Sequence, residues 1–308
     1  MTVFIVALSA LILFTLVMLW LFCFAFVRRN DRDIDNLDAK HNRFLNEYRN
    51  IIEPGMEYID NALHTWVYTE SFDGLRLCAR YFPVKNSHRT IILFHGYRSS
   101  AKRDFSCAVK MYCAMGLNVL LVDQRSHGKS EGKIITFGVK ERYDALAWVD
   151  FVLKNYGDDT DIFLGGMSMG ATTVLLSAGL NLPKNVKGII ADCGFTSPIA
   201  IIKKVSRQAF HISGYIALPI MDLFCRIFGR FSIKGISTTD ALAKSKTPII
   251  MFHGTKDNFV PMEMSRENFD AAGCEKQLFL VENADHGFSY FFDTRGVTEN
   301  VYEFISSH

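Results

Sequence analysis

The chain has 308 residues, of which 49% are hydrophobic, and its formal net charge at pH 7 is only +2. This length can bury one large hydrophobic core, and so small a charge provides no basic excess for a nucleic-acid partner. The seven cysteines include no C-x-x-C pair, which favours buried free thiols in a reducing compartment over a disulfide framework or a zinc site.

The first predicted element is an apolar helix, because residues Thr2 to Val27 contain no charged side chain. A helix of 26 residues would be about 39 Å long, which exceeds a hydrocarbon core of about 30 Å. A cleaved signal peptide would place its basic residues before a shorter apolar stretch. Here Arg28 and Arg29 follow the stretch, and its end, Phe22 to Phe26, is bulky. The sequence therefore predicts an uncleaved transmembrane anchor at residues 1–27, with residues 2–27 as the contact with the membrane.

The polar segment after this helix suggests an orientation. Basic side chains flank only the C-terminal side of the apolar stretch, at Arg28, Arg29, Arg32, Lys40 and Arg43. The positive-inside rule then places the rest of the chain in the cytoplasm. Residues 28–61, rich in Asp, Asn and Arg, are expected to form a polar stalk with some helix.

The remainder, residues 62–308, alternates between strand and helix patterns. Residues 65–84 predict an antiparallel hairpin at a sheet edge, with its turn at Phe72-Asp73-Gly74. Apolar runs then predict strands at 90–95, 118–123, 161–167 and 187–192, separated by helices at about 100–115, 138–155 and 169–180. This alternation predicts an α/β fold, with a mostly parallel sheet and helices on both faces.

The most informative motif is Gly166-Met167-Ser168-Met169-Gly170, which follows the apolar run 161–165. The pattern G-x-S-x-G lets a strand turn sharply into a helix, because only small residues fit where the two elements nearly touch. The serine is then exposed at the turn as a nucleophile. Alone, the pentapeptide is a weak signal, since a Gly-rich turn can produce it by chance.

Two downstream loops supply the partners that such a serine needs. A strand at 247–254 precedes Asp257, and a second strand at 277–281 precedes His286. The order Ser, Asp, His, with each residue after its own strand, predicts a catalytic triad of Ser168, Asp257 and His286. The alternatives are a solvated loop aspartate and a surface histidine.

An upstream strand, Thr90 to Phe94, ends at His95-Gly96-Tyr97. At this place the architecture supplies an oxyanion-hole donor, so we expect the backbone N–H groups of Tyr97 and Met169 to bind the oxygen that becomes negative. One histidine suffices for the proton chemistry, which favours a structural role for His95.

Taken together, these motifs resemble the α/β-hydrolase family, and within it the monoacylglycerol-lipase and serine-aminopeptidase-like branch. The resemblance covers roughly residues 62–308. It rests on the serine pentapeptide and on four further segments: Phe94-His95-Gly96, Val122 to Ser130, Phe252 to Asp257 with Val260-Pro261, and Asp285-His286-Gly287. It implies the same triad and the same oxyanion donors. One departure is Ser126, where the family's Asp-x-Arg-Gly-x-Gly-x-Ser loop has glycine.

The segment between the predicted strand at 187–192 and the one at 247–254, residues 195–246, occupies the position of a lid or cap in this family. Its apolar stretches, at 199–205 and 216–228, are interrupted by basic residues. Such helices commonly bury their apolar side on the core. Alternatively, they form the wall of an acyl pocket or a surface that dips into a bilayer.

The sequence thus predicts a membrane-anchored serine hydrolase that cleaves a lipid-like or small carboxylic ester through an acyl-serine intermediate, without metal or cofactor. A peptidase acting on free N-termini is an alternative, but it needs an acidic pocket, and the lid supplies only Asp222 and Asp240. A non-catalytic binding protein that keeps the fold is a further alternative.

Overall fold

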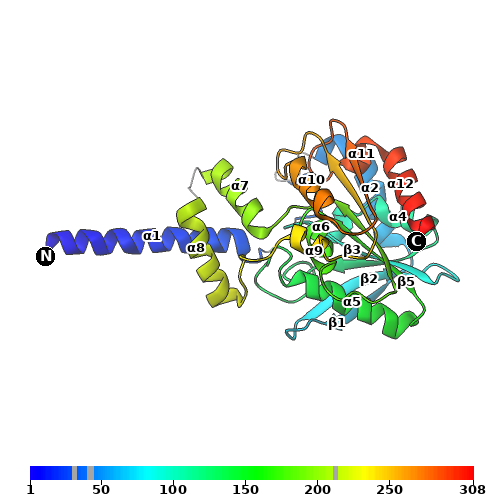
Figure 1. Ribbon diagram of the computed structural model, residues 1–308, viewed down its shortest axis with the longest axis horizontal. Helices are drawn as coiled ribbons and strands as arrows, with labels where there is room; N and C mark the ends of the chain where they lie inside the picture. The colour runs from blue at the N-terminus through cyan, green and yellow to red at the C-terminus, as the bar shows by residue number, and fades with distance from the viewer. Residues whose placement is uncertain (30–32, 40–44, 211–213) are drawn as a thin grey trace.

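The computed structural model describes residues 1–29, 33–39, 45–210 and 214–308. A body built around one sheet carries a long helix that projects from it, with two further helices beside that helix where it leaves the body (Figure 1). Three of the basic residues used to predict the membrane orientation, Arg32, Lys40 and Arg43, lie outside the described residues.

The strands are β1 (Thr65–Glu70), β2 (Arg76–Phe82), β3 (Arg89–Phe94), β4 (Asn118–Asp123), β5 (Asp161–Met167), β6 (Val186–Asp192), β7 (Ile249–Gly254) and β8 (Lys276–Val281). The helices are α1 (Thr2–Phe26), α2 (Arg49–Asn61), α3 (Ala101–Asp104), α4 (Ala108–Ala114), α5 (Glu141–Tyr156), α6 (Met169–Ser177), α7 (Pro198–Phe210), α8 (Gly214–Phe224), α9 (Thr238–Leu242), α10 (Met262–Ala271), α11 (Ser289–Phe292) and α12 (Thr294–Ser307). A π-helical turn, η2 (Cys225–Gly229), continues α8.

The strands form one sheet in the order β1-β2-β4-β3-β5-β6-β7-β8. Strand β2 is antiparallel to both β1 and β4, and the other neighbours are parallel. The predicted edge hairpin and the mostly parallel sheet are therefore confirmed. The single helix expected at about 100–115 is instead two short helices, α3 and α4. The chain turns between them where α2 passes closely, since a side chain at Gly55 would lie 2.3 Å from the Ser106 carbonyl oxygen.

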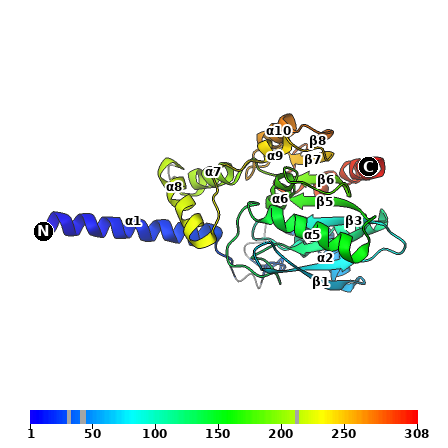
Figure 2. The same cartoon turned by 60° about the horizontal axis from the view of Figure 1, so that its bottom comes forward.

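Helices cover both faces of the sheet because alternate residues of each strand point to opposite sides. On one face, Ile92, Leu164 and their neighbours pack against α5 and α6. On the other face, Ile91, Phe163 and their neighbours pack against α4 and α12. Figure 2 shows α5 and α6 beside the strands of the sheet. The carboxyl ends of the parallel strands, with the loops that follow them, are consequently collected at one edge.

The second half of the predicted stalk is part of the body. Helix α2 has an amphipathic pattern and buries Ile52, Met56 and Ile59. Leu45 and Ile52 share a small apolar cluster with Phe288, which lies near the other end of the chain. The packed body therefore begins before residue 62, because half of the predicted stalk has an apolar face that the polar composition of the segment concealed.

Helix α1 is long and apolar enough to cross a membrane, with a mean hydropathy of 2.8 over its most apolar window. Most of it is exposed, unlike the core helix of a globular protein, but Met18, Phe22 and Phe26 near its end are buried. These three residues belong to an apolar cluster, separate from the two sheet faces, that includes Met221 of α8 and Ile201 of α7. The end of helix α1 is therefore packed onto helices α7 and α8 of the predicted lid.

The predicted lid divides into two parts. Helices α7 and α8 lie beside the end of α1, away from the sheet, in both views (Figures 1 and 2). In contrast, α9 packs against α6 and α10 within the body. Of the segment 195–246 that the sequence assigns to a lid, α9 is thus part of the body, whereas α7 and α8 lie apart from the sheet.

Candidate active site

Ser168 lies at the sharp turn between β5 and α6. It has φ 54° and ψ −113°, a backbone conformation that L-residues rarely adopt. The two glycines of its motif allow this turn: a side chain at Gly170 would lie 1.8 Å from the Phe94 carbonyl oxygen, and one at Gly166 would lie 2.3 Å from the Gly170 carbonyl oxygen. The close approach holds the serine above the carboxyl edge of the sheet.

The structure brings Ser168, His286 and Asp257 together from three separate loops. The His286 Nε2 atom lies 2.8 Å from Ser168 Oγ. On the other side of the ring, Nδ1 lies 2.7 Å from Asp257 Oδ2. Because a carboxylate only accepts, Nδ1 carries the proton, and Nε2 is left to accept the proton of the serine hydroxyl. This arrangement matches that of a nucleophile, a base and an orienting acid.

Asp257 is held as a carboxylate by its surroundings. Burial of its side chain raises the pKa, but hydrogen bonds from His253 and His286 outweigh this effect and bring the pKa well below its ordinary value. His253 is fully buried, and its Nε2 lies 3.1 Å from Asp257 Oδ2 and 2.8 Å from the Val260 carbonyl oxygen. The backbone N–H groups of Phe259 and Val260 also donate to Asp257 Oδ1. The acid is thus fixed in position as well as in charge.

Two loops meet at the position expected for an oxyanion. Met169 is the first residue of α6, and the N–H groups in the first turn of a helix have no acceptor within the helix. The second loop follows β3: the Gly96 N–H donates to Asp104 Oδ2 at 2.8 Å, and Tyr97 comes next. Arg98 follows with φ +48°, and its N–H donates to His127 Nε2 at 3.1 Å. The conformation of this loop is therefore set from both sides of Tyr97.

His95 is fully buried beneath this loop. Its Nδ1 donates to the Gly96 carbonyl oxygen at 2.8 Å, and its Nε2 accepts from the Gln124 N–H at 3.2 Å. Burial lowers the pKa of His95 to about 4, so the ring is neutral at pH 7. These backbone contacts agree with the structural role expected for it.

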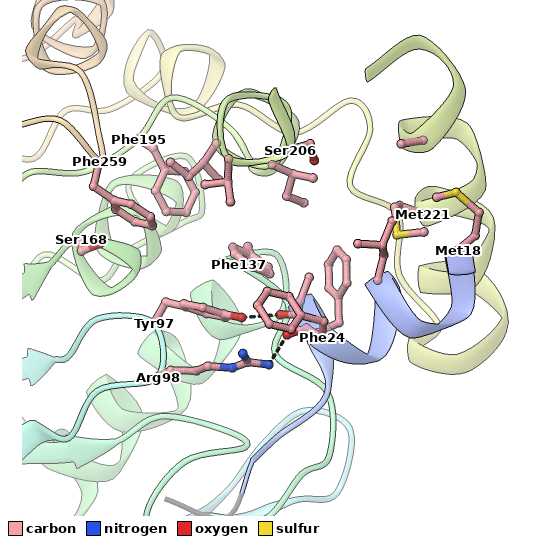
Figure 3. A pocket seen from close by; sticks show the side chains of 17 residues that line it. Met18, Phe24, Tyr97, Arg98, Phe137, Ser168, Phe195, Ser206, Met221 and Phe259 are labelled. Carbon is pink, nitrogen blue, oxygen red and sulfur yellow. Dashed lines mark hydrogen bonds between the residues drawn. The ribbon is translucent and has the colours of Figure 1, made fainter. Parts of the chain in front are cut away.

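Two cavities meet at Ser168. The larger cavity, of about 260 Å³, has a mostly apolar lining. It is lined by Ser168, by residues of α1, α7 and α8, and by aromatic side chains of the body (Figure 3). A second cavity, of about 210 Å³, lies on the side of His286 and includes Ser99, Arg103 and Asp104. Phe259 lines both, and its ring packs edge-on against His286 with the centroids 4.9 Å apart. Ser168 thus lies between two cavities with different linings.

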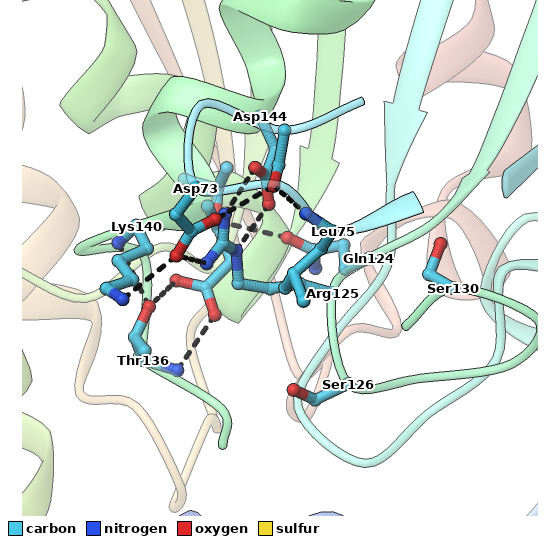
Figure 4. Close-up of polar contacts among 12 residues, drawn as sticks. Asp73, Leu75, Gln124, Arg125, Ser126, Ser130, Thr136, Lys140 and Asp144 are labelled. Carbon is cyan, nitrogen blue, oxygen red and sulfur yellow. Dashed lines mark hydrogen bonds and ion pairs between the residues drawn. The ribbon is translucent and has the colours of Figure 1, made fainter. Parts of the chain in front are cut away.

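The loop after β4 supports this edge of the sheet through a buried ion-pair network (Figure 4). The Arg125 side chain is 2% exposed and donates to both carboxylate oxygens of Asp144, at 2.6 and 2.5 Å. It also donates to Asp73 in the hairpin turn, at 3.0 and 3.1 Å. Ser126, the departure from the family pattern, has φ +64°, which explains why glycine is usual there. Its hydroxyl donates to the Ile134 carbonyl oxygen at 2.9 Å, so the serine is held in this conformation.

Among the described residues, Cys193, Asp257 and His286 offer one cluster with metal-ligand spacing, since their donor atoms lie within 4.8 Å of one another. Burial raises the pKa of the Cys193 thiol well above its usual value, so sulfur stays protonated and is a poor ligand. Asp257 and His286 are already hydrogen-bonded to each other. The donor set suits proton transfer better than metal binding.

The sequence reasoning missed His253, Phe259 and the end of α1 as parts of this site. His253 was visible only as a residue in a strand motif, and no local pattern distinguishes a histidine that supports an acid. Phe259 is two residues after Asp257. The helix α1 carried only a membrane signal, because its spacing could not reveal which face meets the lid.

Comparisons with known proteins show which family and which relatives this chain resembles. Residues 85–232 match the family described as serine aminopeptidase, S33, a segment that contains Ser168 but ends before Asp257. The Bacillus subtilis protein YqkD is 28% identical over 252 residues, which cover 77% of this chain and 82% of YqkD. The Arabidopsis thaliana alpha/beta hydrolase domain-containing protein WAV2 is 26% identical over 235 residues, covering 72% and 71% of the two chains.

Solved structures with the same fold superpose on this chain. The Pyrococcus furiosus esterase Pf2001 superposes with a TM-score of 0.64 at 24% identity, over 81% of this chain and 95% of the esterase. Est1E from Butyrivibrio proteoclasticus, solved with ferulic acid bound, gives a TM-score of 0.60 at 23% identity, over 78% and 98%. The predicted fold class is confirmed.

The depressed pKa of Asp257 predicts how stability depends on acid. A carboxyl whose folded pKa lies below its unfolded value, near about 4, stabilises the fold above that value and loses this contribution as the pH falls towards the folded pKa. We expect the free energy of unfolding of the wild type to fall more steeply between about pH 5 and pH 3 than that of Asp257→Asn. Denaturant titrations at each pH measure this slope. Asp158→Asn, which alters an exposed carboxylate, serves as the control; parallel curves for all three proteins would contradict the prediction.

The network of Arg125 predicts a large loss of stability. Arg125→Met leaves the carboxylate of Asp144 buried without its partner, which typically costs about 3–5 kcal/mol. The free energy of unfolding measures the loss. Arg295→Met removes a surface ion pair with Glu299 instead, and this variant should unfold like the wild type. Equal free energies of unfolding for the two variants would contradict the prediction, because the buried network would then stabilise the fold no more than the surface ion pair.

Proposed function

From the premise that this chain has the α/β-hydrolase fold, we propose that it is a serine hydrolase that cleaves carboxylic esters through an acyl-Ser168 intermediate. One observation carries the proposal: three side chains from different loops form an unbroken hydrogen-bonded chain, from Ser168 Oγ through His286 to Asp257, where two cavities meet. A non-catalytic binding protein would not need this arrangement.

Each residue has a defined part in the proposed reaction. His286 Nε2 takes the proton as Ser168 Oγ attacks the ester carbonyl, and Asp257 stabilises the imidazolium that forms. The N–H groups of Tyr97 and Met169 bind the oxyanion of the tetrahedral intermediate. His286 then returns the proton to the leaving alcohol, which departs and leaves the acyl group on Ser168. His286 then takes a proton from a water molecule that attacks the acyl group, and returns it to Ser168 Oγ as the carboxylic acid leaves.

The description of the matching family, serine aminopeptidase, suggests a peptidase as the alternative function. An enzyme that acts on free N-termini needs a carboxylate in its pocket to bind the amine. Of the described residues that line the two cavities, Asp104 is acidic, but it accepts hydrogen bonds from the Gly96 N–H and Ser99 and contacts Arg103. Asp222 is occupied by Arg226 and Ser232 on the lid, and Asp240 lies on α9 in the body. The apolar cavity favours an acyl chain over an amino terminus.

The exposed apolar surface of α1 supports the second part of the proposal, a single-pass attachment to a membrane. A helix of 25 residues is about 37 Å long, enough to span with tilt. Arg28 and Arg29 at its end favour a cytoplasmic location for the body. The attachment would hold Ser168 near a lipid surface.

The first experiment identifies the nucleophile. We expect a fluorophosphonate probe to label Ser168, and Ser168→Ala to abolish both labelling and ester hydrolysis, with His286→Ala nearly as damaging because the triad acts as a unit. Mass spectrometry of the labelled peptide locates the adduct. Ser177→Ala, in the same helix, is a matched control that should retain labelling. An adduct on another residue, or faster cleavage of aminoacyl anilides than of esters, would contradict the assignment.

The second experiment tests the topology. The protein should remain with the membrane fraction after a high-salt wash, because burial of α1 in lipid does not depend on ionic contacts. Protease added to intact cells should leave the body uncut, whereas permeabilised cells should lose it. Digestion of the body in intact cells would reverse the proposed orientation.

A further inference from the structure

The apolar cavity at Ser168 has an unusual wall. Five of its lining residues come from α1: Met18, Leu21, Phe24, Ala25 and Phe26. The lid supplies Ile201, Ile202, Val205 and Ser206 of α7 and Ala217 and Met221 of α8. Residues of the body complete it near the serine. Figure 3 draws Ser168 at one end of the cavity and Met18 and Met221 at the other, so the cavity runs from the candidate nucleophile along the predicted anchor.

Hydrogen bonds fix the end of α1 to the loop that carries the proposed oxyanion donor. The Tyr97 hydroxyl donates to the Ala25 carbonyl oxygen at 2.8 Å. The Arg98 guanidinium donates to the carbonyl oxygens of Phe24 and Val27. These bonds use carbonyls in the last turn of the helix, where no N–H within the helix is available. Ala25 is therefore held close to the reacting end of the cavity.

A second set of contacts joins the chain just after α1 to the loop after β4. The Ile135 N–H donates to the Phe26 carbonyl oxygen, and the Arg28 N–H donates to the Lys133 carbonyl oxygen, both at 2.8 Å. The Arg28 side chain donates to the carbonyl oxygens of Gly128 and Ser130. With α1 bonded to the body on two sides, its face toward the cavity is a defined surface and not a loosely tethered segment.

The far end of the cavity lies among the parts of the molecule that expose apolar side chains. Phe22 of α1 packs against Phe224 and Phe228, with ring centroids 5.8 and 5.5 Å apart. On the same stretch of the lid, Leu223, Ile227 and Phe228 are more than half exposed. Exposed apolar residues of α1 continue from this point toward the N-terminus, along the part of the helix that projects from the body (Figure 1). If α1 lies in a bilayer, this part of the lid meets the lipid beside it.

We propose that the last three turns of α1 form one wall of the acyl-chain site, so that the substrate is an ester of a lipid that resides in the bilayer, and α1 residues determine which chain lengths are accepted. This inference rests on the proposed function of Ser168. The ester carbonyl lies at Ser168, the acyl chain extends past Ala25 toward Met18, and the alcohol part occupies the cavity beside His286. The predicted membrane anchor thus also acts as a specificity element.

Substitutions at different positions along α1 should then limit the acyl chain at different lengths. Ala25 is bonded through its carbonyl to Tyr97, whereas Met18 lies two helical turns away, about 10 Å along the axis. A bulky side chain at Ala25 should block most of the cavity, and one at Met18 should block only its far end. Each methylene that the cavity buries contributes about fourfold to kcat/KM, so the loss should grow with every carbon excluded.

The experiment uses the full chain in phospholipid nanodiscs and measures kcat/KM for p-nitrophenyl acetate, butyrate, octanoate and laurate. We expect Ala25→Trp to lower the ratio of octanoate to acetate by at least about tenfold, and Met18→Trp to lower laurate more than octanoate. Met18→Ala should shift the profile toward longer chains. Leu16→Trp is the matched control, because Leu16 is on the same helix, 57% exposed and outside the cavity; its profile should equal that of the wild type.

The outcomes separate the two proposals. If the fluorophosphonate probe labels Ser168 but the Met18 and Ala25 variants keep the wild-type chain-length profile, α1 is only a tether, and the proposed function stands without this inference. If Ser168 is not labelled and no ester is cleaved, the proposed function itself fails. Should Ala25→Trp not fold, the two Met18 variants still decide the question, since they change the end of the cavity that is distant from the hydrogen bonds to Tyr97 and Arg98.

Discussion

The close contact of α6 with β3 and β5 is the constraint on which the site depends. No side chain fits at Gly170, which faces the Phe94 carbonyl oxygen, or at Gly166, which faces Gly170. This contact forces the strained conformation of Ser168 and brings the first N–H of α6 beside the loop after β3. The parallel order of β5, β7 and β8 then delivers the loops with Asp257 and His286 to the same edge. The strain at one residue is supported by the packing of the whole sheet.

Buried polar groups keep this edge in one arrangement. Asp257 accepts from two histidines and two backbone N–H groups, and Arg125 joins the loop after β4 to the edge hairpin through Asp73. Each of these charges would be costly in the interior without its partners. Because the partners come from distant segments, the charges penalise any packing that separates those segments. The arrangement of Ser168, His286 and Asp257 therefore depends on the complete domain.

The structure also joins two features that lie far apart in the chain. The apolar N-terminal helix carries a membrane signal, and the serine motif carries a catalytic one, yet α1 ends within hydrogen-bonding distance of Tyr97 and lines the cavity at Ser168. Helices α7 and α8 pack against the end of α1 and line the same cavity. In the proposed function, attachment to lipid, access to the acyl site and the position of the loop that carries Tyr97 therefore share one set of contacts. A change in any one of them is expected to reach the other two.

The sequence by itself determined the alternation of strands and helices, the edge hairpin and the local chemistry of the serine motif, because these follow from periodicity and from glycines at fixed spacing. It also named Asp257 and His286 as candidates by their order after strands. Only the tertiary structure decided that α2 belongs to the body, that α9 is not part of the lid, that His253 supports Asp257 and that α1 lines the cavity. The physical reason is the same in each case. Local patterns specify which face of an element is apolar, but the partner that covers that face comes from a distant part of the chain, and only packing selects it.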